Sequence, residues 1–171
     1  KRSLSQAVRP EMEALARETG ESVNLAVPLG REALYLDQVE GTKLVRLFTA
    51  PGSRAPLHAT GVGKVFLAYL GVPEGRSLTP YTPHTLTRLP DLLRELEAVR
   101  GPGYALDNEE KELGLRCVAA PVFGASGGVV AALSLSAPAS RLSLEEAHRL
   151  APRVVEAARR ASLRLGYTGE V

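Results

Sequence analysis

Small polar side chains interrupt two strand-like segments that are otherwise apolar. The segments Arg116–Phe123 and Val129–Ser136 flank a glycine-rich turn, which predicts a β-hairpin. A four-residue loop places Cys117 opposite Ser136, with Ser134 on the same strand face, whereas a bulge would break this register. Because buried hydroxyl groups need hydrogen-bond partners, this cluster could form one wall of a site for a small polar ligand.

A second candidate for chemistry is the segment Leu57–Lys64, where a helix is expected to begin. Thr60 is a good N-cap, and the N–H groups of Gly61 and Val62 have no acceptor within the helix. These free N–H groups and the helix dipole together favour a bound carboxylate or phosphate. The alternative is an ordinary capped helix whose glycines allow close packing.

The run from Gly61 to Lys64 is not a nucleotide-binding loop. A Walker A motif needs Ser or Thr after the lysine, and Val65 stands there. It also needs Gly at the position of His58.

Asp107 ends a short strand expected over Gly103–Asp107. There it could accept a hydrogen bond from a ligand hydroxyl, or repel doubly charged ligands. The simpler alternative is a solvated turn residue or a cap for the next segment. The acidic residues that follow predict a solvated face: Glu109, Glu110 and Glu112.

The sequence does not indicate an activated nucleophile or a metal site. Cys117 would need a neighbouring histidine, and His58, His84 and His148 stand in no supporting motif. A lone cysteine in a strand is usually a small inert apolar residue. The histidines and the cysteine also lack metal-ligand spacing, so we expect no catalytic residue, no metal and no cofactor.

Length and composition predict one globular domain. The chain has 171 residues, 44% hydrophobic and 23% charged, with a net charge of +2 that does not argue for a nucleic-acid surface. Its one cysteine excludes an intramolecular disulfide and suits a reducing cytoplasm. No apolar run approaches the roughly 20 residues of a membrane span, so we expect no membrane contact.

The pattern of apolar residues and turn signals predicts an α+β fold, with an antiparallel β-sheet covered by helices. A helix that Pro10 opens or bends should end at Gly20, and one that Ser143 caps should end at Gly166. The remaining expected elements are strands Val23–Leu29 and Ala33–Val39, a short strand around Lys43–Thr49, a loop over Ala50–Pro56, and helices Thr60–Leu70 and Thr87–Arg100.

Three ordered blocks carry a family resemblance. The run GYALDNEE…GLRCVAAPVF…GGVVAALSLSAPASRLS resembles the ligand-binding domain of isocitrate-lyase-regulator (IclR) type transcription factors. Gly52–Leu70 and Glu18–Val27 match the same family pattern, and the similarity extends from about Glu11 to Leu165. This resemblance implies a GAF-like (profilin-like) sensor fold.

The resemblance also implies a pocket for a small organic acid. The backbone of Gly61 and Val62 would bind the carboxylate, and Ala55 would leave room for a bulkier ligand, so that aromatic acids are as plausible as pyruvate-sized ones. The polar wall would consist of Asp107, Cys117, Ser134 and Ser136, and the apolar wall of Leu44, Leu47 and Leu115.

The same resemblance predicts a longer regulator. Residues 1–19 would be the linker helix from a missing N-terminal winged helix-turn-helix domain, and residues 20–171 the effector-binding domain. DNA would be bound only through the missing domain, and the protein would form a homodimer or homotetramer. The regulator would act as a repressor or as an activator. Two alternatives stay open: an oligomerisation module without a small ligand, and a small hydrolase using Cys117 or Ser134.

Overall fold

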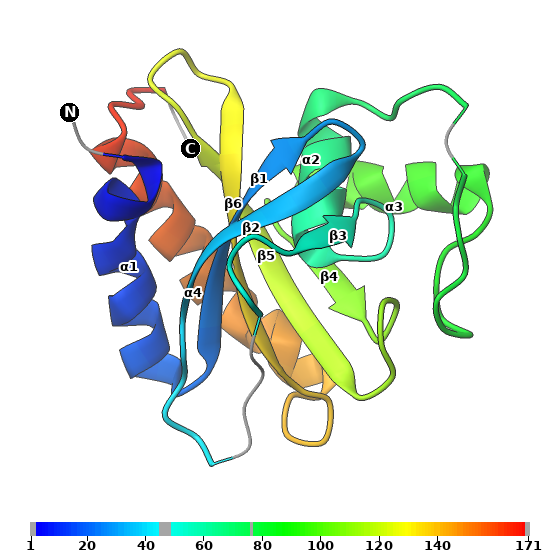
Figure 1. Ribbon diagram of the computed structural model, residues 1–171, viewed down its shortest axis with the longest axis horizontal. Helices are drawn as coiled ribbons and strands as arrows, with labels where there is room; N and C mark the ends of the chain where they lie inside the picture. The colour runs from blue at the N-terminus through cyan, green and yellow to red at the C-terminus, as the bar shows by residue number, and fades with distance from the viewer. Residues whose placement is uncertain (1–2, 45–48, 76, 170–171) are drawn as a thin grey trace.

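The computed structural model describes residues 3–44, 49–75 and 77–169. It shows one sheet of six antiparallel strands in the order β3-β2-β1-β6-β5-β4, with helices on both faces (Figure 1). This confirms the expected α+β class. The elements are α1 Leu4–Thr19, β1 Ser22–Leu29, β2 Glu32–Val39, β3 Arg54–Pro56, α2 Gly61–Leu70, α3 Leu89–Arg100, β4 Ala105–Asn108, β5 Leu115–Phe123, β6 Val129–Pro138 and α4 Leu144–Arg164.

Alternation along the strands gives the sheet two buried faces. Helices α1 and α4 lie side by side on one face, whose strand residues are mostly Val and Leu (Figure 1). Helices α2 and α3 cover the other, whose core strand residues are mostly alanines, such as Ala26, Ala119 and Ala132. The small side chains let α2 approach closely: a Cβ on Gly61 would lie 3.1 Å from that of Ala119.

The hairpin of β5 and β6 has the predicted register. Cys117 pairs with Ser136, and Ala119 pairs with Ser134. The register shifts between Val122 and Phe123, near the loop end of the hairpin. The bulge therefore lies beyond the polar cluster and leaves its pairing intact.

Helix boundaries follow local signals. Thr60 caps α2 by accepting the N–H of Gly63, and Ser143 caps α4 in the same way through Glu146. Gly20 ends α1 in the left-handed conformation, with φ of 74°. Pro10 lies inside α1, which runs without interruption from Leu4 to Thr19, so Pro10 does not open this helix.

Some expected boundaries were wrong. Lys43 and Thr49 are not in a strand, and residues 45–48 lie outside the described part of the chain. The third strand is Arg54–Pro56, in the segment expected to be a loop, because it pairs with the start of β2. Three residues are too few to show a periodic pattern, so only this pairing defines the strand.

Two further elements start two residues later than predicted. Helix α3 begins at Leu89, with Pro90 in its first turn. Strand β4 begins at Ala105 because Gly103 adopts a φ of 83°, which is incompatible with a strand.

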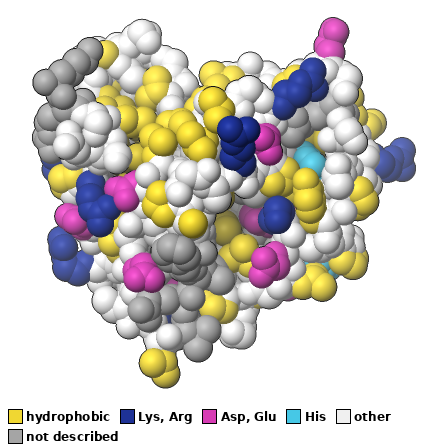
Figure 2. Space-filling model, viewed as in Figure 1, with side chains coloured by type: hydrophobic (Ala, Val, Ile, Leu, Met, Phe, Trp, Pro, Cys, Tyr) yellow, Lys and Arg dark blue, Asp and Glu magenta, His cyan; other side chains and the backbone are white. Residues whose placement is uncertain are grey.

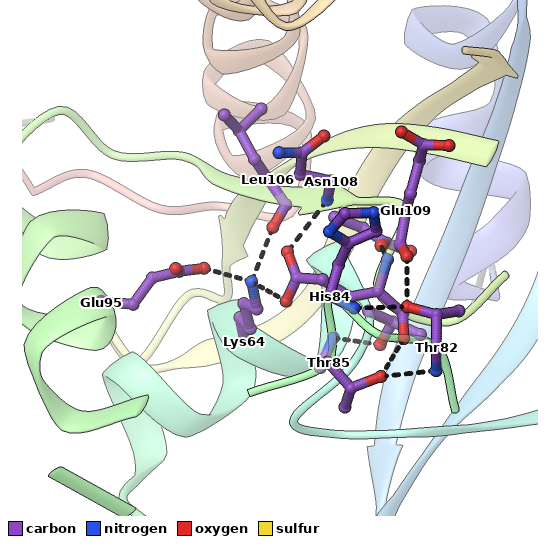
Figure 3. A network of polar contacts seen from close by, with 12 residues as sticks. Lys64, Thr82, His84, Thr85, Glu95, Leu106, Asn108 and Glu109 are labelled. Carbon is purple, nitrogen blue, oxygen red and sulfur yellow. Dashed lines mark hydrogen bonds and ion pairs between the residues drawn. The ribbon is translucent and has the colours of Figure 1, made fainter. Parts of the chain in front are cut away.

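Lys64 is fully buried on α2 and joins four segments (Figure 3). Its ammonium contacts the carboxylates of Glu95 on α3 and Glu110 in the acidic loop, the latter at 2.6 Å. It also donates to the backbone oxygen of Leu106 on β4, at 2.8 Å. The lysine is therefore a structural cation between α2, α3, β4 and the loop after β4.

Charged side chains are spread over the surface. On the face shown in Figure 2, Lys and Arg alternate with Asp and Glu among apolar and uncharged groups, without a continuous basic surface. None of the helices in the described ranges has the length and apolar character that a bilayer crossing requires.

We expect Gly63→Ala to lower the free energy of unfolding by about 2 kcal/mol or more, because overpacking a tight contact forces backbone shifts. The added Cβ would lie 2.3 Å from the backbone oxygen of Leu57. Gly101→Ala is the matched control, since Gly101 has a φ of −66° and no neighbour within 4 Å of the added Cβ. Urea unfolding measures both, and equal effects would contradict the packing role of Gly63.

We expect Lys64→Met to destabilise the chain by about 3–5 kcal/mol, because it leaves a buried carboxylate without its cation. The side chain of Glu110 is only 7% exposed. Lys111→Met is the control, because the Lys111 ammonium lies 5.1 Å above the ring of Tyr81 and lines a cavity. If thermal unfolding shows the two variants to be equally stable, Lys64 is not the structural cation described above.

Candidate functional site

A cavity of about 370 Å³ lies between β2, β3, the start of α2 and the ends of β4–β6. It contains four of the predicted site residues: Asp107, Leu115, Cys117 and Ser136. Ala55 also lines it, at the position where a small side chain was expected to leave room. The lining also includes Tyr35, Arg54 and Lys111, which the sequence analysis did not single out, and Glu112, which it placed on a solvated face.

A polar row crosses the sheet at one edge of this cavity. Asp107 on β4 pairs with Cys117 on β5, and Cys117 pairs with Ser136 on β6. The sulfur of Cys117 and the hydroxyl oxygen of Ser136 lie 3.2 Å apart. Strand register alone therefore places three predicted residues side by side on the sheet face that α2 covers.

Asn24 on β1 is a partner that the sequence analysis missed. Its Nδ2 group donates to the hydroxyl oxygens of Ser134 and Ser136, at 3.3 and 3.1 Å. Its Oδ1 atom accepts from Nε2 of Gln38 at 2.9 Å. Ser134 does not line the cavity, so it supports Ser136 through Asn24. The sequence signal that could have identified Asn24 is a polar amide side chain inside the otherwise apolar strand expected over Val23–Leu29.

The start of α2 lies against the cavity through Thr60. The Thr60 hydroxyl accepts the N–H of Gly63 at 3.1 Å and donates to the backbone oxygen of Pro56 at 2.7 Å. The first bond of the helix runs from the N–H of Lys64 to the backbone oxygen of Thr60, so the N–H groups of Gly61 and Val62 have no acceptor within the helix. Neither Gly61 nor Val62 is among the residues that line the cavity. The glycines also serve close packing, so both interpretations of this segment have a physical basis.

Asp107 is a buried acid and not a solvated turn residue, with 1% of its surface exposed. Burial raises its pKa to about 7, despite the N–H of Glu110, which its carboxylate accepts at 2.8 Å. The neighbouring Glu110 carboxylate also raises this pKa, and Lys64 lowers it. Near neutral pH the side chain can therefore donate or accept a hydrogen bond.

The expected solvated acidic face was wrong for two of its three members. Glu110 is buried against Lys64, and Glu109 binds the guanidinium of Arg116 at 3.1 Å. Only Glu112 is exposed. Thr82 and Thr85 donate hydrogen bonds to the backbone oxygens of Glu109 and Glu110, which hold this loop in place (Figure 3).

The environment of Cys117 disfavours the thiolate that nucleophilic catalysis requires. Burial, and next the charge of Asp107, raise the pKa of this thiol well above its ordinary value. Burial likewise raises the pKa of the Tyr35 hydroxyl. His58 binds the backbone oxygen of Thr79 and His148 binds Tyr104, so both rings are engaged elsewhere.

The predicted apolar wall is only partly placed. Leu115 lines the cavity, whereas Leu44 is 93% exposed and does not. Leu47 lies outside the described residues. Within the described ranges, no group of three His, Cys, Asp or Glu side chains could hold a metal ion.

Comparisons with known proteins agree with this architecture. Residues 1–163 match the family described as "Bacterial transcriptional regulator IclR C-terminal". The "HTH-type transcriptional regulator XynR" of Escherichia coli K12 is 38% identical over 170 residues, which cover 96% of this chain and 68% of that protein. The chain spans 54–68% of the length of the first curated relatives it matches.

Solved structures share the fold. The Thermotoga maritima IclR has a TM-score of 0.88 at 34% identity, covering 98% of this chain and 70% of its own. The inducer binding domain of a PobR double mutant from Acinetobacter, in complex with 3-hydroxybenzoic acid, has a TM-score of 0.84 at 26% identity, covering 94% and 98%. The expected GAF-like fold of α+β type is thereby confirmed.

The buried Asp107 generates a prediction about pH. Since its pKa is raised from 3.8 to about 7, the folded state binds more protons than the unfolded state between these values. The free energy of unfolding should therefore fall as pH rises from 4 to 7, with a contribution approaching about 1.4 kcal/mol per pH unit, and level off above 7. Asp107→Asn should remove this contribution, as urea unfolding at several pH values can measure. A stability difference between variant and parent that stays constant with pH would contradict the assignment.

Proposed function

The chain belongs to the IclR family of bacterial transcriptional regulators, over the C-terminal part of such proteins, and from this premise we propose that its cavity binds a small organic carboxylate. The family consists of transcriptional regulators, so the chain is a regulatory domain and not an enzyme. Binding of the acid would control attachment to DNA by a longer regulator.

The observation that supports the proposal is that Asp107 and Thr60, the N-cap of α2, line one cavity. A ligand carboxylate would accept from the N–H groups of Gly61 and Val62, where the helix dipole favours negative charge. At the other end, Asp107 and the Ser136 hydroxyl would bind a hydroxyl or keto group of the same ligand. Arg54, Lys111 and Glu112 also line the cavity, and the charges of these three side chains sum to one positive charge.

The size of the cavity supports an acid larger than pyruvate. Its volume of about 370 Å³ lies within the range of small-molecule pockets. Ala55 contributes little bulk to the lining. The PobR domain was crystallised with 3-hydroxybenzoic acid, an aromatic acid with one carboxylate and one hydroxyl. An aromatic hydroxy acid is therefore a suitable first probe.

Regulation would follow from unequal affinity of the acid for two arrangements of the domains. Residues 1–19 would link this domain to an N-terminal winged helix-turn-helix domain. Val8, Met12 and Leu15 of α1 belong to the core shared with α4, so α1 would transmit a shift of the effector domain. The assembly would be a homodimer or homotetramer.

Calorimetric titration with 3-hydroxybenzoate and with pyruvate tests the proposal. We expect the double substitution Ser134→Ala and Ser136→Ala to weaken acid binding at least tenfold, equivalent to about 1.4 kcal/mol, because it removes two hydroxyls that orient the polar end. Ser140→Ala, in an exposed loop after β6, is the matched control and should bind as the parent does.

Other outcomes distinguish the alternatives. If neither acid binds, an oligomerisation module without a ligand is favoured. If the double variant binds as the parent does, the polar wall is assigned wrongly. Turnover of a bound acid would instead support the hydrolase.

A further inference from the structure

A larger cavity, of about 480 Å³, lies at the free edge of β4. Ala98 and Val99 of α3 line one side, and Leu144 and His148 of α4 line the other. Leu106 of β4 lies between them. The cavity therefore occupies the gap between the two helical layers, where the sheet ends.

This cavity is separate from the acid site. The two have no lining residue in common. They lie on either side of the segment 107–110: Asp107 lines the acid cavity, and Glu110 lines the larger one. A ligand in the larger cavity would thus be an addition to the function proposed above.

Charge distinguishes the larger cavity from the acid site. Glu95 and Glu110 line it, and none of the described residues in its lining is Lys or Arg. The ammonium of Lys64 lies behind both carboxylates and pairs with each of them. Two carboxylates against one ammonium leave a net negative charge, and Glu95 keeps 37% of its side chain exposed. Such a site repels carboxylates and attracts a cation.

The remaining surface suits the apolar body of a ligand. Val99 and Leu106 form its floor beside Leu144 and Pro102. Tyr104 adds an aromatic ring, held by a 2.7 Å hydrogen bond between its hydroxyl and Nδ1 of His148. An aromatic ring also contacts cations favourably through its face.

The edge of β4 is not suited to pairing with an added peptide strand. The backbone oxygen of Leu106 already accepts from Lys64, at 2.8 Å. The N–H of Asn108 already donates to the carboxylate of Glu110, at 2.9 Å (Figure 3). Strand addition needs these groups free, so a small molecule fits the cavity better than a strand of another chain.

We propose that this cavity is a second ligand site, which binds a small protonated amine with an apolar body. The ammonium group lies against Glu95 and Asn108, and the apolar body lies against Val99, Leu106 and Leu144. The site selects by charge in the opposite sense to the acid cavity.

The test titrates this chain with 2-phenylethylamine and with 3-phenylpropionate, which have similar apolar bodies and opposite charges. We expect the amine to bind at least tenfold more tightly than the acid. Amide chemical-shift changes on the unmodified chain should gather at Ala98, Leu106 and His148.

Ala98→Phe, on the exposed side of α3, should fill the cavity and weaken amine binding at least tenfold. Leu93→Phe is the matched control, because Leu93 is exposed on the same helix and does not line the cavity. Glu95→Gln should weaken the amine several-fold with little change in volume. Binding of 3-hydroxybenzoate should be unaffected by Ala98→Phe, so failure of the acid site and failure of this site are distinguishable.

The proposal is overturned if the amine does not bind, or if it binds no better than 3-phenylpropionate. It is also overturned if the shift changes gather at Tyr35, Cys117 and Ser136, because the amine would then occupy the acid cavity. Equal weakening by Ala98→Phe and Leu93→Phe would likewise count against it.

Discussion

The burial of one ammonium group, that of Lys64, is the constraint on which the arrangement around both cavities depends. Burying a charged group costs roughly several kcal/mol unless hydrogen-bond and ion-pair partners replace the water that it loses. Here Glu95, Glu110 and the backbone oxygen of Leu106 provide those partners. Because these groups come from α3, the acidic loop and β4, satisfying the charge of one lysine fixes how three segments lie against α2.

This arrangement extends to the acid site through Glu110. Its side chain binds Lys64, while its N–H donates to the carboxylate of Asp107. Asp107 is thereby held in the same register row as Cys117 and Ser136. The polar wall is also supported from the other side, because Asn24 orients Ser134 and Ser136. Such prior ordering lowers the entropic cost of binding a ligand.

The two cavities lie on either side of the same short segment and differ in their charged lining residues. The acid cavity is lined by Arg54, Lys111 and Glu112, by Asp107, whose pKa is raised toward neutrality, and by the helix N-cap Thr60. The larger cavity contains two glutamates and two histidines, and none of the described residues that line it is Lys or Arg. A hydrogen bond from the N–H of Glu110 to the carboxylate of Asp107 joins the two sides of this segment.

Local patterns in the sequence determined the class of fold, most helices and the hairpin register. Thr60 and Ser143 marked helix starts through a capping interaction that spans three residues, and alternation with a short turn set Cys117 opposite Ser136. Four of the nine predicted site residues line the acid cavity because strand register alone brings Asp107, Cys117 and Ser136 together, beside Leu115. Only the tertiary structure decided that Arg54–Pro56 is a strand, that Glu110 is buried, that Asn24 binds both serines, and that Leu44 is exposed. Each of these depends on contacts between segments far apart in the chain, and a local pattern cannot specify a partner that only folding brings near.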